Sequence, residues 1–191
     1  VAGIEFASRT VLRLGVALLG MRITFDQIGG LGVAPVAMVV VGVSTTIVFG
    51  LVLARSLQLS RTFGVLSGGA VAICGVAAAL AIASALPRNA QSERDTIVAV
   101  VSVTALSTIA MILYPILVEA LGLDHRLAGV FLGGTIHDVA QVVGAGYMIS
   151  PESGDIATYV KMLRVAMLLP VVLAIALVLS RQATTSEKRR T

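Results

Sequence analysis

The sequence is poor in charged residues, aromatic residues and cysteine, and each shortage narrows the class of protein. Charged residues make up 13% of the chain, against about 25% in a typical soluble domain. The single cysteine, Cys74, excludes a disulfide framework within the chain. Aromatic residues account for 4%, and the bases are scattered, so there is no basic aromatic surface that would read nucleic-acid bases. Nucleic acid is therefore not expected as a partner.

Long apolar segments take the place of the missing polar surface. Hydrophobic residues form 57% of the chain and the mean hydropathy is +0.99. A bilayer crossing needs roughly 20 apolar helical residues, and uninterrupted runs of that length favour helices over barrel strands. We predict an all-α polytopic membrane helix bundle of about six transmembrane segments in residues 1–180. The candidate spans are 4–20, 31–54, 63–86, 96–121, 127–149 and 156–180.

The basic residues predict an orientation in the membrane. With six crossings, one side would receive Arg55, Arg61, Arg126 and the bases of the C-terminal tail. The positive-inside rule assigns that side to the cytoplasm. Residues 181–191 are then a basic cytoplasmic tail, which we predict to be disordered and to touch lipid headgroups. Because the chain begins with Val1 rather than methionine, we expect a fragment or a processed product.

Glycines interrupt two of the predicted spans. Glycine adds backbone freedom, so these spans are candidates for the broken helices that build substrate sites in carriers. Close packing of helices through small residues is the alternative. The glycines in question are Gly68, Gly69 and Gly75 in the earlier span, and Gly133 and Gly134 in the later one.

The same two spans contain a candidate internal repeat. Residues 61–69 read RTFGVLSGG and residues 126–134 read RLAGVFLGG. A chance match is the alternative, because glycine, valine and leucine are frequent throughout the chain. If both segments cross the membrane fully, the repeat is parallel, and only a re-entrant geometry would invert it.

The later of these spans also carries polar groups. Its sequence GGTIHDVAQVVGAG contains His137, Asp138 and Gln141, whose spacings would place them on roughly one helical face. An ionisable residue at mid-membrane costs about 2.5 to 3.5 kcal/mol on insertion scales, so the pair needs a polar cavity or a partner. A structural polar cluster that ties helices together is the alternative interpretation.

Positive counterparts occur on the first and last spans. Arg13 and Arg164 lie deep in their apolar runs and are candidates for binding Asp138 or an anion. Lys161 shares a helical face with Arg164 but lies nearer the start of its run. We expect Lys161 to extend its ammonium group to the headgroups.

Four runs of the sequence resemble the YeiH-like family of sulfate exporters. They are VLRLGVALLGMRITFDQIG at 11–29, ICGVAAALA at 73–81, GGTIHDVAQVVGAGYMISP at 133–151 and KMLRVAMLLP at 161–170. The resemblance implies a bacterial inner-membrane protein related to the bile-acid/sodium symporter and cation/proton antiporter folds, of which this chain resembles the central part. The sequence departs from the family in two places. It has His137–Asp138 where the family usually has His-Glu, and Ala72 and Ala77 where hydroxyl residues are common.

The leading functional hypothesis is a secondary transporter that exports a small anion, with sulfate as the first guess. Arg13 and Arg164 would bind the anion, and His137 and Asp138 would couple its movement to protons, with sodium as the other candidate ion. We expect no enzymatic activity, no cofactor and no metal site, and the sequence is compatible with a homo-oligomer in the lipid bilayer. Two alternatives are an intramembrane enzyme that uses His137 and Asp138, and a structural membrane subunit without transport activity.

Overall fold

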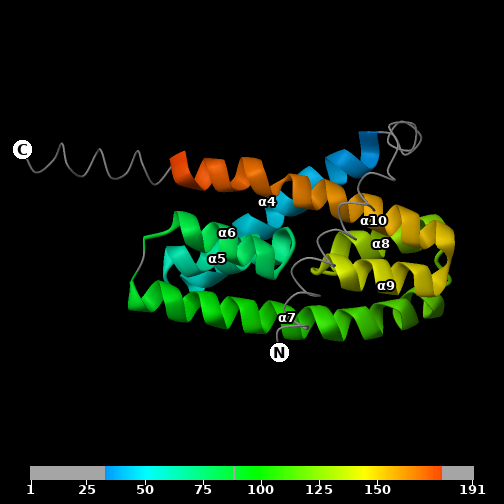
Figure 1. Ribbon diagram of the computed structural model, residues 1–191, viewed down its shortest axis with the longest axis horizontal. Coiled ribbons are helices and arrows are strands. Elements are labelled where there is room, and N and C mark those ends of the chain that lie inside the picture. Colours follow the sequence, from blue (N-terminus) through cyan, green and yellow to red (C-terminus); the bar gives the residue numbers. More distant parts are fainter. Residues whose placement is uncertain (1–32, 88, 178–191) are drawn as a thin grey trace, which may run out of the picture. The chain divides into compact units, whose positions relative to one another are not determined.

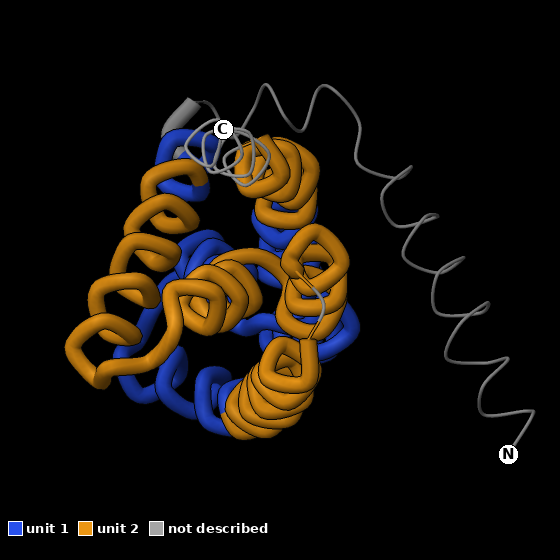
Figure 2. Tube along the Cα trace, turned by 90° about the vertical axis from the view of Figure 1, so that its left-hand side faces the viewer, with its two compact units in different colours: residues 1–39, 110–163 blue, residues 40–109, 164–191 orange. Residues whose placement is uncertain are grey.

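A computed structural model describes residues 33–87 and 89–177 of the chain, and every regular element in them is an α-helix. Figure 1 shows the helices, whose labels are used below. The described residues fall into two compact units (Figure 2), and each is described by itself. The helices are α4 (Val33–Ser56), α5 (Arg61–Ala72), α6 (Val76–Ala85), α7 (Ala90–Ala120), α8 (His125–Thr135), α9 (Val139–Ile149) and α10 (Pro151–Ala166).

In the unit that contains residues 40–109, α5 and α6 form a helical hairpin. Helix α5 packs closely against α4, because a Cβ atom on Gly50 would lie 2.7 Å from Gly68 Cα. The Ser60 hydroxyl at the start of α5 lies 3.5 Å from the Asp95 carboxylate near the start of α7. Since α6 ends at Ala85, shortly before α7 begins, the hairpin starts and ends at the same end of this unit.

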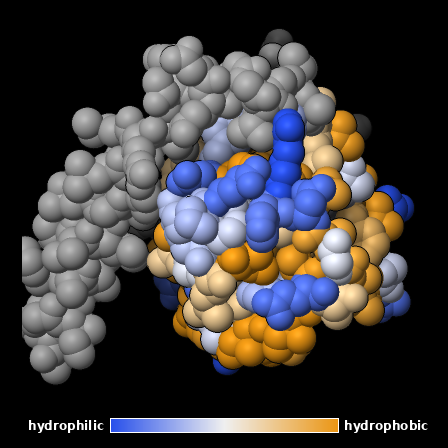
Figure 3. All heavy atoms as spheres, turned by 90° about the vertical axis from the view of Figure 1, so that its right-hand side faces the viewer, coloured by the Kyte–Doolittle hydropathy of each residue, from blue (hydrophilic) through white to orange (hydrophobic). Residues whose placement is uncertain are grey.

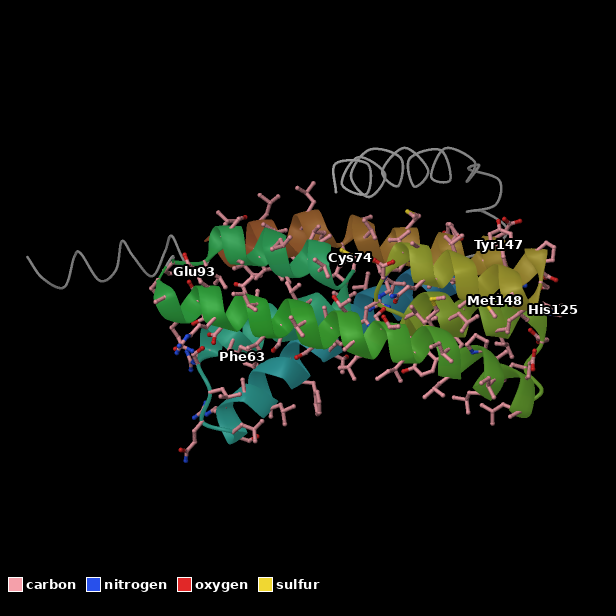
Figure 4. The ribbon with its side chains drawn as sticks, turned by 60° about the horizontal axis from the view of Figure 1, so that its bottom comes forward. Phe63, Cys74, Glu93, His125, Tyr147 and Met148 are labelled. Atoms are coloured by element: carbon pink, nitrogen blue, oxygen red, sulfur yellow. The ribbon has the colours of Figure 1, made fainter. Side chains whose placement is uncertain are left out.

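The side-chain view supports this arrangement. Figure 4 shows Phe63 and Glu93 toward one end of the unit and Cys74 at the tip of the hairpin, between α5 and α6. The core between the two hairpin helices and their neighbours is apolar and consists of Leu66, Ala70, Ala79, Ile82, Leu86 and Ala99. The segment 63–86 is therefore a hairpin rather than one continuous helix.

In the unit that contains residues 110–163, α8 and α9 form a second hairpin. Helix α8 runs parallel to α10, since Gly129 lies against Ser153 and Ile156, and Gly133, one turn later in α8, lies against Ala157. Helix α9 runs antiparallel to α10, since Gly146 lies against Gly154 and Ala157. The start of α8 and the end of α9 therefore meet at one end of this unit, where Figure 4 shows His125, Tyr147 and Met148.

Two side-chain hydrogen bonds fix the open end of the second hairpin. The Ser153 hydroxyl donates to the His125 carbonyl at 2.8 Å, and the Tyr147 hydroxyl donates to the Asp155 carboxylate at 2.5 Å. Figure 3 shows hydrophilic residues gathered on the face of the molecule that lies on this side. Exposed polar residues of this end are Glu119, Asp124, His125, Arg126, Glu152 and Asp155. Such a cluster suits the water-facing end of a membrane-embedded bundle.

Three helical segments are long and apolar enough to cross a membrane. They are Pro35–Ser56, Ala90–Ala120 and Pro151–Leu177, the last of which continues beyond α10 after a turn at Met167. The predicted all-α class is confirmed, but the count of six spans is not. The candidate spans 63–86 and 127–149 each consist of two shorter helices, and both the candidate span 4–20 and the tail 181–191 lie outside the described residues.

The glycines expected at the interruptions occupy two kinds of position. Gly75 lies between α5 and α6 with φ 68°, a conformation that residues with a Cβ rarely adopt, so a glycine is required there. Gly68 and Gly69 lie within α5, and Gly133 and Gly134 lie within α8. Gly68, Gly69 and Gly133 allow close packing onto neighbouring helices, which was the alternative role considered for the glycines.

The hairpin geometry predicts which loops share a side of the membrane. Labelling of Gln58→Cys and Gln91→Cys, in a Cys74→Ala background, should occur from the same side, because both loops lie at the open end of the first hairpin. Leu121→Cys and Glu152→Cys should likewise share a side. The measurement is modification by a membrane-impermeant maleimide in sealed vesicles of known orientation. Opposite labelling within either pair would mean that the segment between the two cysteines crosses the membrane fully.

Two adjacent glycines of α8 offer a matched test of its packing. A Cβ on Gly133 would collide with the Ala157 backbone of α10, whereas a Cβ on Gly134 meets no described atom within 4 Å. Gly133→Ala should therefore destabilise the protein by about 1 to 3 kcal/mol through overpacking. Gly134→Ala should be neutral or stabilising by up to about 1 kcal/mol, because alanine favours the helix. Thermal unfolding in detergent measures both, and equal effects would contradict the α8–α10 contact.

Candidate functional site

The first hairpin breaks at residues 73–75, between α5 and α6. A break inside a membrane leaves backbone carbonyls at the end of one helix and N–H groups at the start of the next without helical partners. Arg164 of α10 supplies donors to the carbonyls. Its Nε donates to the Ala72 carbonyl at 3.0 Å, and its Nη2 donates to Val71 and Ala72 at 2.9 and 2.7 Å. Arg164 is 6% exposed, so these are buried charge-assisted hydrogen bonds.

The other side of this break is the N-terminus of α6. Gly75 occupies the N-cap position, and no side chain forms a cap hydrogen bond there. The neighbouring Cys74 thiol is buried and lies within electrostatic range of the Arg164 guanidinium. The partial positive charge of a helix N-terminus and a buried guanidinium therefore occur at the same short break. This combination favours a negative charge.

The second hairpin breaks at residues 136–138, between α8 and α9. Here the carbonyls of Ile136 and His137 accept hydrogen bonds from the Lys161 ammonium of α10, the former at 3.1 Å. Lys161 is fully buried, with 0% exposure. The expectation that Lys161 extends to the headgroups is thus wrong, because its ammonium is used inside the unit to satisfy backbone carbonyls.

Asp138 caps the helix that follows the second break. Its Oδ1 accepts the backbone N–H of Ala140 at 2.9 Å and that of Gln141 at 3.2 Å. A carboxylate at a helix N-terminus satisfies orphan donors and interacts favourably with the helix dipole. The two breaks therefore differ, since α9 begins with its own carboxylate and α6 begins with a glycine.

The predicted site residues are distributed as follows. His137, Asp138 and Gln141 gather at the second break, but His137 and Asp138 precede α9, so the three do not share one helical face. The prediction of a shared face fails because the chain leaves the helical conformation after Thr135. Arg164 lies at the first break, and Arg13 lies outside the described residues.

Sequence reasoning missed the role of Lys161. Two signals could have found it: the three-residue spacing to Arg164, and its distance of about 15 Å from the start of α10 at 1.5 Å per residue. The sequence also did not show where the two helical hairpins break. Ile73 and Cys74 have no special backbone propensity, and Ile136 is an ordinary strand or helix former.

Two further features bear on the chemistry of the site. In residues 33–87 and 89–177, no group of three or more His, Cys, Asp or Glu side chains could hold a metal ion. A cavity of about 460 Å³ lies between α6 and α7, lined by residues that include Leu80, Ser84, Glu93 and Thr96. Because these residues lie toward the open end of the first hairpin, the cavity is separate from the break.

Helices long enough to span a bilayer, together with hairpins whose breaks are satisfied by buried cations, define a helical membrane protein. The whole chain, residues 1–191, matches the family described as "Conserved hypothetical protein 698". The chain belongs to this family. Its relatives are membrane proteins of the UPF0324 group, and the resemblance to the YeiH-like family is confirmed.

Relatives from several bacteria share more than half of their aligned residues with this chain. UPF0324 membrane protein CT0845 of Chlorobaculum tepidum is 60% identical over 180 residues, covering 94% of this chain and 50% of that protein. UPF0324 membrane protein RB0971 of Rhizobium meliloti is 59% identical over 94% of this chain and 52% of its own length. UPF0324 membrane protein TauZ of Paracoccus pantotrophus is 57% identical, with coverages of 92% and 52%. The chain thus spans about half the length of these relatives, and no solved structure matches it.

The cap at the second break can be tested by substitution. Asp138→Ala should destabilise the protein by about 1 kcal/mol, because two N–H groups of α9 lose their acceptor. Asp138→Asn should stay close to the wild type, because its amide oxygen still accepts these hydrogen bonds. Asp124→Ala is a matched control, since Asp124 caps α8 through the N–H of Leu127 and its loss should cost a similar amount. Thermal unfolding is the measurement, and equal losses for Asp138→Asn and Asp138→Ala would show that charge rather than capping matters.

Proposed function

We propose that the protein is a secondary transporter that exports a small anion, with sulfate as the first candidate, across the bacterial inner membrane. The observation that carries the proposal is the pair of helical hairpins whose buried breaks are each held by a cation of α10. Discontinuous helices of this kind place half-helix ends at mid-membrane, where they bind substrates and coupling ions in carriers. A purely structural bundle has no need of such breaks, which each leave backbone groups to be satisfied.

The chemistry of the first break supports an anion as the substrate. The N-terminus of α6 has backbone N–H groups and no side-chain cap, and helix N-termini bind oxyanions readily. The Arg164 guanidinium, which binds the carbonyls at the end of α5, adds a full positive charge at the same break. We therefore assign anion binding to the tip of the α5–α6 hairpin.

The second break is assigned to coupling rather than to anion binding. The Asp138 carboxylate already occupies the N-terminus of α9 and would repel an anion there. His137 lies beside it in the chain, and an imidazole can both accept and donate a proton. Proton coupling through His137 and Asp138 is consistent with this arrangement.

The charges of the loops support an orientation. Arg55, Arg61 and Arg94 lie near the N-terminal end of α7 and the open end of the first hairpin. Around and beyond the C-terminal end of α7, the carboxylates of Glu119, Asp124, Glu152 and Asp155 outnumber the exposed base Arg126. This arrangement differs from the prediction from six full crossings, which placed Arg126 on the same side as Arg55 and Arg61. By the positive-inside rule, α7 would begin on the cytoplasmic side. The α5–α6 hairpin, whose open end lies at the start of α7, would then enter the membrane from the cytoplasm.

Sulfate flux through proteoliposomes tests the proposal. Arg164→Gln should lower the flux at least tenfold, because the loss of one charge-assisted hydrogen bond costs about 1.5 to 3 kcal/mol. His137→Ala should lower the flux driven by a proton gradient. Arg94→Gln, an exposed position at the start of α7, should leave the flux unchanged.

A binding measurement separates lost transport from lost folding. Sulfate should raise the unfolding temperature of the wild type and of Arg94→Gln, and should not raise that of Arg164→Gln. If wild-type protein moves no sulfate or related oxyanion, the proposed function is wrong. If Arg164→Gln and His137→Ala both transport at the wild-type rate, the assignment of these residues is wrong.

A further inference from the structure

The Lys161 ammonium lies at a place where carriers bind ions. Helix α8 ends at Thr135, and the carbonyls of the next two residues both accept hydrogen bonds from Lys161 Nζ. The C-terminal end of a helix carries partial negative charge. Unwound carbonyls together with such half-helix ends form the coordination sites of sodium ions and protons in transporters with broken helices. In this protein the corresponding carbonyl oxygens accept hydrogen bonds from the Lys161 side chain.

The position of Lys161 in its helix requires this contact. It lies in the interior of the apolar segment Pro151–Leu177 and is fully buried. An ammonium group at that depth needs oxygen partners, and backbone carbonyls freed by the break are among the partners that it has. The charge of Lys161 and the negative end of α8 therefore compensate each other.

We infer that Lys161 is a built-in cation of the α8–α9 hairpin, and that this hairpin consequently binds no sodium ion. The inference deepens the proposed function, on which it rests, because it removes sodium from the candidate coupling ions and leaves the proton. A sodium ion would have to displace an ammonium that is covalently attached to α10 and therefore always present at high local concentration. Coordination of both cations by the same two carbonyls would also bring two positive charges together.

An independent contact in the other unit has the same chemistry. The C-terminal end of α5 presents the carbonyls of Val71 and Ala72, and the Arg164 guanidinium occupies them. Each hairpin thus satisfies the end of its first helix with a side chain of α10. Neither of these two helix ends requires a metal ion. The two contacts support the same conclusion although they involve different helices and different cationic groups.

The thermal stability of the purified protein tests the inference without any transport assay. Replacement of choline chloride by sodium chloride at constant ionic strength should leave the unfolding temperature of the wild type unchanged. A saturable, sodium-specific rise would overturn the inference, since any ligand that binds only the folded state raises its stability. This arm requires no variant.

A second experiment removes the Lys161 ammonium by substitution. Lys161→Ala should lower the unfolding temperature by several degrees, and sodium or n-propylammonium should restore at least half of the loss, because each can enter the vacated site. Choline, which is too large and has no N–H donor, should restore none. Arg126→Ala is the control: this exposed position on α8 should show neither the loss nor the restoration.

The outcomes separate the site from the function. If Lys161→Ala is as stable as the wild type, or is destabilised and restored by neither cation, the carbonyls are not a cation site. If Lys161→Ala does not fold, Lys161→Gln keeps a donor to the carbonyls without the charge, and the wild-type arm still decides. Wild-type sulfate flux that follows a sodium gradient would overturn the inference but support transport. Absence of flux, with the stability results as expected, would overturn the proposed function alone.

Discussion

The arrangement of this protein depends on one constraint: backbone carbonyls and N–H groups exposed by a break in a membrane helix need partners that the lipid cannot supply. Both hairpins contain such a break, and in both the carbonyls at the end of the first helix bind a cation of α10. The cost of burying Lys161 and Arg164 and the cost of leaving carbonyls unsatisfied are each several kcal/mol in isolation. Hydrogen bonds between a buried cation and the freed carbonyls remove both costs at once. The breaks and the cations therefore depend on each other.

The N–H side of each break is treated differently, and this difference gives the two hairpins their separate chemistry. Asp138 neutralises the start of α9 with its carboxylate. Gly75 leaves the start of α6 without a side-chain cap. A glycine is suited to this position on two grounds: its φ of 68° is permitted, and it adds no side chain between the helix end and a ligand. Under the proposed function, this difference would leave the first break to an anion and the second to a proton.

The sequence was sufficient to predict the helical membrane class and the interruption of the two glycine-containing spans. It was insufficient for the direction of the chain after each break. A hairpin and a continuous crossing have the same apolar composition, and what distinguishes them is tertiary contact, such as that of Gly129 with Ser153 or of Ser60 with Asp95. The surroundings of the Asp138 carboxylate differ from the prediction for a similar reason. On a continuous helix it would project to a neighbour, whereas at a helix start it accepts hydrogen bonds from its own backbone.

The placement of Lys161 and Arg164 within one helix constrains how the hairpins can move. The two residues are three apart on α10 and so project from nearly the same face of it. Within the unit that contains residues 110–163, a rotation of α10 about its axis would draw the Lys161 ammonium away from the Ile136 and His137 carbonyls. These carbonyls would then lose a charged donor that lipid cannot replace. A translation that carries a hairpin along with α10 keeps its contact intact. Conformational change in this protein should therefore preserve the α10–hairpin contacts and take place at surfaces where helices meet through apolar side chains, since these can slide without losing a charge-assisted hydrogen bond.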